Sequence, residues 1–143
     1  MRSIGLDIGD ARIGVAVSDA SGTVASPLAV LDARALEVDV RPLARLVEEY
    51  EAEMLVVGVP VTLGGEEGPQ AGHVRERADR LGDAVGLPVA YWDERLSSAE
   101  ARRLMREAGM SDRDQRGVVD KLAAALILQA WLDSRREQAR DGG

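Results

Sequence analysis

Residues 5–19 read GLDIGDARIGVAVSD, and this stretch decides how the fold begins. Residues 3–8 and 13–18 each have the length and apolar content of a β-strand, and Gly9 stands in the short connection between them. Asp7 interrupts the first apolar run, and a buried carboxylate is costly unless another group compensates its charge. The stretch therefore predicts a β-hairpin whose first strand carries an acid that needs a partner.

The following segment continues the sheet and then changes to helical spacing. Residues 23–31 form a third predicted strand, and Pro27 within it favours an edge position. Because the three strands are joined by short connections, we expect an antiparallel meander. The apolar run 54–59 does not alternate, which is typical of a strand covered on both faces. Helices are predicted on either side of it by Leu43, Leu46, Val47 and Tyr50 and by Val74, Ala78 and Leu81.

The last third of the chain adds one strand and two helices. Residues 87–92 form the fifth predicted strand, and Ser97 with Glu100 matches a capping box of a helix that ends near Gly109. The final helix is expected over about 118–136. This order predicts an α/β fold with a five-stranded mixed sheet, antiparallel over its first three strands, and helices on both faces.

Length and composition limit the class of protein. The 143 residues suffice for one domain, which we expect over residues 1–138, followed by a frayed tail over residues 139–143. The absence of cysteine excludes thiolate chemistry, and the single histidine, His73, excludes a multi-histidine metal site. No apolar run is long enough for a membrane span and the N-terminus lacks a signal-peptide pattern, so we expect a cytoplasmic protein without membrane contact.

Three acidic residues stand where a solvated carboxylate is not expected. Asp7 lies near the end of the first strand, Glu94 follows the fifth strand, and Asp120 begins an apolar helix. Ligands bind open α/β sheets at the carboxyl ends of the parallel strands, so we expect these side chains to converge there. Their mutual repulsion calls for cations, and carboxylates without His or Cys favour Mg²⁺ or Mn²⁺. Two such ions suit phosphodiester hydrolysis.

Each of the three acids also has an interpretation without chemistry. Asp7 could accept hydrogen bonds from turn amides, Asp120 could interact with the helix dipole, and Glu94 could pair with Arg95. Asp120 shares one helical face with the small residue Ala124, which lets the helix approach the sheet closely. The joint placement of all three acids favours the metal site.

Four stretches give the chain a resemblance to a known family. They are GLDIGDARIGVAVSD, LVVGVPVTLGGEEGPQA, WDERLSSAEA and VVDKLAAALILQAWL, which are spread from residue 4 to about residue 132. The chain resembles the YqgF/RuvX family, the pre-16S rRNA nuclease and Holliday-junction-resolvase-like proteins of bacteria. The resemblance implies an RNase H-like fold and a metal-dependent nuclease that acts on structured nucleic acid. It also implies that Asp7, Glu94 and Asp120 form the acidic centre.

Two positions depart from the pattern of that family. Lys121 stands where the family commonly has a small residue after the aspartate, and it adds a cation beside the expected metal site. Strand 54–59 ends without an acid, although RNase H-like proteins usually carry their second acid there. Glu94 must therefore supply it from the neighbouring strand. The alternatives to Glu94 are Asp93, Glu66 and Glu67.

Basic side chains accompany these acids although the net charge is -7. All of them except Lys121 are arginines, whose planar fork suits phosphate groups. A solvated helix face with local ion pairs, or an arginine-rich genome, is the alternative explanation. The candidates for contacts with nucleic acid are Arg12, Arg95, Arg102, Arg103, Arg106 and Lys121.

We therefore expect a Mg²⁺- or Mn²⁺-dependent endonuclease, and the resemblance implies 5′-end processing of pre-16S rRNA in ribosome biogenesis. One alternative is a Holliday junction resolvase, which would act as a homodimer because a symmetric junction requires two sites. Another is a non-catalytic nucleic-acid-binding protein with ribosome-assembly contacts. A nucleotide-binding phosphotransferase, suggested by the LDIG stretch, would need a second related domain, for which the chain leaves no room.

Overall fold

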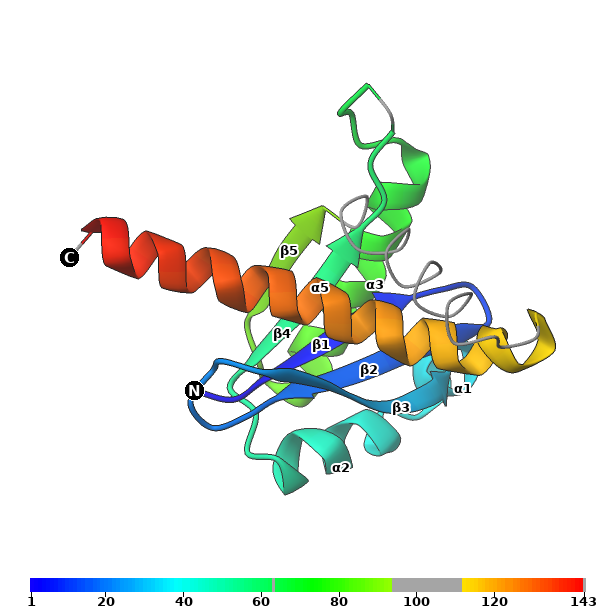
Figure 1. Cartoon of the computed structure of the whole chain (residues 1–143). Helices are drawn as coiled ribbons and strands as arrows, with labels where there is room; N and C mark the ends of the chain where they lie inside the picture. The colour runs from blue at the N-terminus through cyan, green and yellow to red at the C-terminus, as the bar shows by residue number, and fades with distance from the viewer. Residues whose placement is uncertain (63, 94–111, 143) are drawn as a thin grey trace.

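A five-stranded mixed sheet forms the centre of the protein, as a computed structural model shows (Figure 1). The structure describes residues 1–62, 64–93 and 112–142. The strands are β1 (Ser3–Ile8), β2 (Arg12–Ser18), β3 (Ala25–Asp32), β4 (Met54–Val59) and β5 (Val89–Asp93). Their order is β3-β2-β1-β4-β5, in which β1 to β3 are antiparallel neighbours and β4 and β5 run parallel to β1.

The antiparallel meander follows from its short turns. The amide of Gly9 donates to the carbonyl of Arg12 at 2.9 Å and closes the turn between β1 and β2. Strand β3 lies at the edge of the sheet, where Pro27 pairs with Ala16 beside an irregularity of the register. An edge strand tolerates proline because one side of its backbone has no neighbouring strand. The predicted meander and the predicted edge position are both confirmed.

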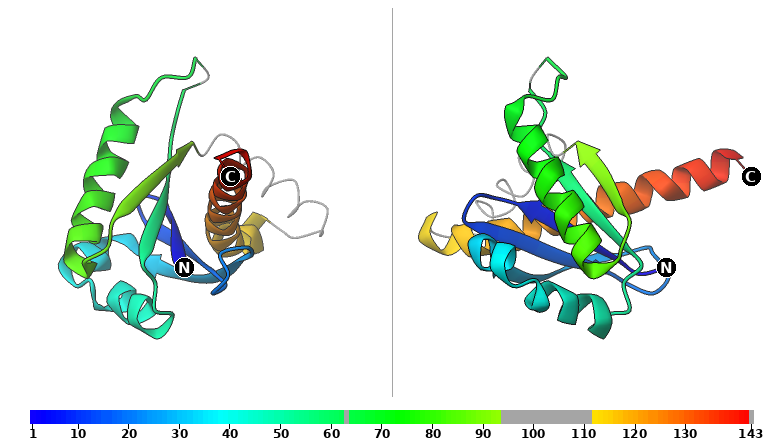
Figure 2. Two further views of the ribbon diagram at one scale, coloured as in Figure 1. Left: turned by 90° about the vertical axis from the view of Figure 1, so that its left-hand side faces the viewer. Right: turned by 180° about the vertical axis from the view of Figure 1, so that it is seen from behind.

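Helices cover both faces of the sheet (Figure 2). One face carries α1 (Ala33–Val38), α2 (Arg41–Glu49) and α3 (Pro69–Val85), and the other carries α5 (Asp112–Gly142). Strand β4 is buried between two cores, to which it contributes Leu55 and Val57 on one face and Val56 on the other. This double burial explains its continuous apolar run. Within the described ranges, no helix combines the length and apolarity needed to cross a bilayer.

Two helices differ from the prediction. The sequence does not predict α1, which begins directly after β3, where the Asp32 carboxylate accepts a hydrogen bond from the Ala35 amide at 2.9 Å. Helix α5 exceeds the predicted range 118–136 at both ends, because the polar residues that flank this range include good helix formers. The predicted helix capped by Ser97 lies outside the described residues. The division into one domain and a tail stays a prediction.

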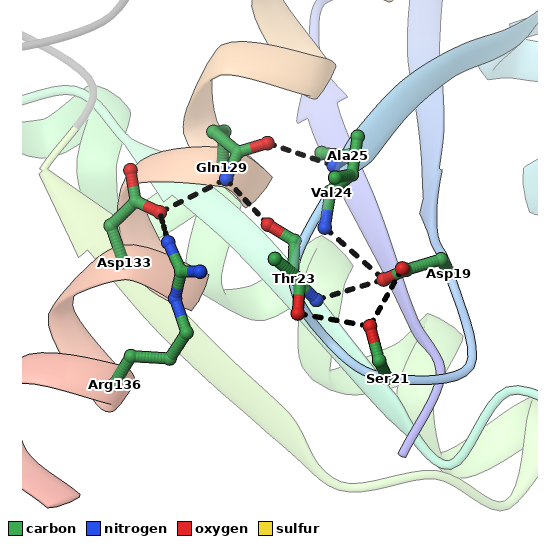
Figure 3. Close-up of polar contacts among 8 residues, drawn as sticks. All are labelled: Asp19, Ser21, Thr23, Val24, Ala25, Gln129, Asp133 and Arg136. Carbon is green, nitrogen blue, oxygen red and sulfur yellow. Dashed lines mark hydrogen bonds and ion pairs between the residues drawn. The ribbon is translucent and has the colours of Figure 1, made fainter.

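Polar side chains hold the second half of α5 against the connection between β2 and β3 (Figure 3). The Gln129 side chain accepts a hydrogen bond from the Ala25 amide and donates one to the Thr23 carbonyl, both at 2.8 Å. Asp19 closes the same connection by accepting hydrogen bonds from the Ser21 hydroxyl at 2.7 Å and from the Thr23 amide at 2.8 Å. The two hydrogen bonds of Gln129 thus join α5 to this connection.

Candidate active site

Asp7 lies one residue before the end of β1, on the face of the sheet that α5 covers. The even-numbered residues of this strand, from Ile4 to Ile8, pack in the core beneath α1, α2 and α3. Because side chains alternate between the two faces of a strand, Asp7 and Gly5 point the other way. Asp7 is partly buried there, and its partner across the hairpin is Gly14.

The backbone of helix α5 packs directly against two glycines of this hairpin, Gly5 and Gly14. A Cβ atom at Gly14 would lie 1.9 Å from the Asp120 carbonyl oxygen, and one at Gly5 would lie 2.9 Å from the Ala124 carbonyl oxygen. Both distances are too short for a Cβ atom, so the helix can lie this close to the hairpin only because these two residues are glycines. The contact places Asp120 over the residue that pairs with Asp7. Two acids that are far apart in the sequence thus lie on the same face of the sheet, with Asp120 next to the strand residue that pairs with Asp7.

Arg12 connects the hairpin to the helix at this point. Its Nε atom donates to Oδ2 of Asp120 at 2.6 Å, the short distance of a charge-assisted hydrogen bond. The Asp120 side chain is 21% exposed and the Arg12 side chain is 46% exposed. The carboxylate is therefore mostly enclosed between helix and hairpin, while the guanidinium reaches it from the solvent side.

A second arginine supports the turn that follows β1 from the opposite face. Nη1 of Arg77, on α3, donates to the Gly9 carbonyl at 3.0 Å, and its Nε lies 3.7 Å from Oε1 of Glu37. The Arg77 side chain is only 16% exposed. Arg77 is not among the residues predicted from the sequence. A signal for it is present, since position 77 lies between Val74 and Leu81 on the apolar face of the helix.

The acids of the loop after β4 lie in different surroundings. Glu67 accepts hydrogen bonds from Nε and Nη2 of Arg75 at 2.6 and 2.8 Å, and this contact lowers the pKa of its carboxyl group. The Arg75 guanidinium also stacks on the Tyr91 ring, 4.2 Å from its centroid. Glu66 is exposed in the same loop. Glu67 is therefore engaged in an ion pair that links this loop to α3.

The third acid of the predicted centre is not among the described residues. Asp93, at the end of β5, shares its face with Val89 and Tyr91, which pack in the core beneath α3. Asp93 thus lies on the face opposite Asp7. In the part of the chain that the structure describes, no three acidic or histidine side chains gather closely enough to hold a metal ion. Glu94 lies outside that part, and its role stays a prediction.

Of the basic residues predicted to contact nucleic acid, two are among the described residues and four are not. Arg12 lies at the site, in the ion pair with Asp120. Lys121 is half-buried, and its amide nitrogen would be 2.9 Å from a Cβ atom at Gly14. The remaining candidates lie outside the described residues, and they are Arg95, Arg102, Arg103 and Arg106.

The two described acids suit a hard divalent cation. Their ligand atoms are carboxylate oxygens, the donors that Mg²⁺ and Mn²⁺ prefer. Asp7 and Asp120 come from different elements, and the contact of α5 with Gly14, the residue that pairs with Asp7, places both on the same face of the sheet. The carboxylates of Asp7 and Asp120 therefore fit such an ion, which would need further ligands besides these two.

The sheet order, the helices on both faces and the acid near the end of β1 define an RNase H-like fold, and the predicted fold class is confirmed. The chain aligns with a structure of T. thermophilus RuvC in complex with Holliday junction substrate at a TM-score of 0.58 and 18% identity, over 96% of both chains. It also aligns with the fowlpox virus resolvase in complex with Holliday junction DNA at a TM-score of 0.55 and 11% identity, over 94% of this chain and 99% of that one. At these identities the likeness concerns the fold alone.

The chain belongs to the RuvX family, whose profile, described as a Holliday junction resolvase, matches residues 1–134. A relative from Desulforudis audaxviator is 46% identical over 136 residues, which are 95% of this chain and 96% of the relative. Another from Anaeromyxobacter sp. is 47% identical over 135 residues, which are 94% of this chain and 98% of the relative. Both carry the name "Putative pre-16S rRNA nuclease". The family resemblance of the four sequence stretches is confirmed.

Proposed function

We propose that this protein is a cytoplasmic, divalent-metal-dependent endonuclease that processes the 5′ end of pre-16S rRNA. The observation that carries the proposal is that α5 places Asp120 against Gly14, the residue that pairs with Asp7, on one face of an RNase H-like sheet. The relatives named as pre-16S rRNA nucleases, at 46% and 47% identity over nearly their whole length, support the choice of substrate.

The chain contributes fixed carboxylates to this reaction. Asp7 is held by the pairing of β1 with β2, and Asp120 by the backbone contact of α5 with Gly14. Both would hold Mg²⁺ or Mn²⁺, and Glu94 is the predicted third ligand. When bound, such ions would supply an activated water as the nucleophile and positive charge for the leaving oxygen. In the hydrolysis, the water gives up a proton as its oxygen bonds to phosphorus, the bridging phosphorus–oxygen bond breaks, and the leaving oxygen takes up a proton.

A second candidate function is the resolution of branched DNA. The description of the matching family profile as a Holliday junction resolvase favours it. Resolving a symmetric junction requires two sites related by symmetry, so this function would need a homodimer. The two candidates share the same metal chemistry and differ in substrate and oligomeric state.

One cleavage experiment distinguishes these functions. A precursor 16S rRNA fragment and a four-way DNA junction are each incubated with the purified protein in Mg²⁺, in Mn²⁺ and in EDTA. The Asp7→Asn variant removes a charged ligand at the site. Asp10→Asn is the matched control, because Asp10 is an exposed acid in the turn of the same hairpin.

We expect metal-dependent cleavage of the precursor rRNA by the parent and by Asp10→Asn, and none by Asp7→Asn. Preferred cleavage of the junction, together with a dimer in solution, would support the second candidate. If Asp7→Asn cuts as fast as the parent, the metal mechanism is wrong. If neither substrate is cut but the rRNA is bound without metal, the protein is a non-catalytic assembly factor.

A further inference from the structure

We propose that Arg12 competes with the divalent metal ion for the Asp120 carboxylate, so that metal binding displaces its guanidinium. This inference rests on the proposed function and deepens it. The observation behind it is that the carboxylate expected to bind the metal is already engaged at one of its two oxygens, since Nε of Arg12 lies 2.6 Å from Oδ2 of Asp120. A guanidinium at that distance and a divalent ion on the same carboxylate would repel each other.

An alternative role for Arg12 would be to orient Asp120 for the metal, as residues around metal ligands often do. The structure argues against this role, because Asp120 is positioned from its backbone. The Asp120 carbonyl oxygen lies 1.9 Å from the position of a Cβ atom on Gly14, and farther along α5 the Gln129 side chain hydrogen bonds to Ala25 and Thr23. With the helix seated in this way, the ion pair supplies charge compensation rather than position.

The Arg12 side chain can also move away from Asp120 without disturbing the fold. Arg12 is the first residue of β2, its side chain is 46% exposed, and its long stem reaches the carboxylate from the solvent side. After displacement, the guanidinium remains at the open edge of the site beside the proposed metal ions. Arginine binds phosphate groups through its planar fork, so a displaced Arg12 would be available to a substrate phosphate.

Calorimetric titration of Mn²⁺ into the metal-free parent and its variants tests the competition directly. Arg12→Gln removes the charge and keeps a polar side chain of moderate length, whereas Arg12→Lys keeps the charge. Arg41→Gln is the matched control, because Arg41 also forms a close ion pair with an aspartate, Asp39, in a different part of the molecule. Circular dichroism of each variant checks that the fold is retained.

We expect Arg12→Gln to bind Mn²⁺ about three- to tenfold more tightly than the parent. Arg12→Lys should stay within about twofold of the parent, and Arg41→Gln should match it. The Mn²⁺-induced rise in melting temperature should also be larger for Arg12→Gln, because the stabilisation by a ligand that binds the folded state grows with the logarithm of its concentration relative to Kd. This readout does not depend on cleavage.

Equal or weaker Mn²⁺ binding by Arg12→Gln would overturn the competition and favour the orienting role. Tightening by Arg12→Lys to the level of Arg12→Gln would also overturn it, because the competing charge is retained in that variant. If the parent binds Mn²⁺ and cuts its substrate while Arg12→Gln binds no better, only this inference fails. If the parent neither binds Mn²⁺ nor cuts, the proposed function fails with it.

Discussion

Helix α5 meets the sheet in two different ways along its length. At its Asp120 end the contact is made by backbone, since the carbonyl oxygen lies against Gly14, and Arg12 forms the ion pair described there. At its Gln129 end the polar contact is made by a side chain, since Gln129 accepts a hydrogen bond from the Ala25 amide and donates one to the Thr23 carbonyl (Figure 3). The difference teaches that one end of the helix is fastened by the Gln129 side chain, while at the other end the backbone contact positions Asp120, whose carboxylate is paired with Arg12.

The backbone contact at Gly14 should be the most sensitive point of the molecule. In the Gly14→Ala variant the new Cβ atom would lie 1.9 Å from the Asp120 carbonyl oxygen, so α5 must shift. We expect a loss of about 3 kcal/mol in the free energy of unfolding, measured by urea denaturation. Because a displacement of about 1 Å can cost a hundredfold in rate, cleavage should fall by about that factor or more.

The same substitution at Gly72 provides the control for this prediction. Gly72 lies in α3, and a Cβ atom there would meet nothing within 4 Å. Gly72→Ala should therefore stabilise the protein by about 0.5–1 kcal/mol through its higher helix propensity, with unchanged cleavage. Equal effects of the two substitutions would refute the special role of the contact at Gly14.

The polar end of α5 should show a smaller effect, mainly on stability. Gln129→Ala leaves the Ala25 amide and the Thr23 carbonyl without their side-chain partner, which we expect to cost about 1–2 kcal/mol. Cleavage by the folded variant should stay within about threefold of the parent. Gln138→Ala, an exposed position on the same helix, should change neither quantity. If Gln129→Ala lost as much cleavage activity as Gly14→Ala, the proposed difference between the two ends of α5 would be wrong.

The smallest expected effect is the pH dependence of stability at the β2–β3 connection. The hydrogen bond from the Ser21 hydroxyl, followed by those from the Thr23 and Val24 amides, lowers the pKa of Asp19 from 3.8 to about 2. The folded state thus prefers the charged form, and this stabilisation is present above pH about 4 and lost as the pH falls through about 2. Thermal melts between pH 2 and 5 should show a shallower decline for Asp19→Asn than for the parent. An identical decline would show that Asp19 does not contribute.

The sequence predicts the sheet and the two described acids because both depend on local pattern. Strands β1, β2 and β4 follow from apolar runs and turns, and Asp7 and Asp120 are conspicuous as acids within such runs. Helix α1 is not predicted because its six residues span fewer than two helical turns, which is too short to show a repeating apolar pattern. Its start depends on Asp32, which is also the last residue of a strand.

The remaining features of the site depend on contacts between distant parts of the chain. Gly14 reads as an ordinary small residue of an alternating strand, and its role appears only when α5 lies against it. Arg12 carries no signal that it faces Asp120 rather than solvent. The polar role of Gln129 likewise requires the approach of the β2–β3 connection. Such pairings are set by tertiary packing, which a single sequence does not display.

The central claim is that Asp7 and Asp120 act as one metal-dependent unit, and a double-mutant cycle of single-turnover cleavage tests it most directly. The rates of the parent, Asp7→Asn, Asp120→Asn and the double variant are compared at saturating Mn²⁺ on the substrate that the parent cuts. Residues that act as a unit have strongly non-additive effects. Each single variant should lose about a thousandfold or more, and the double variant should be no slower than the slower single one. A single variant that keeps more than about a tenth of the parent rate, or losses that multiply in the double variant, would contradict the account.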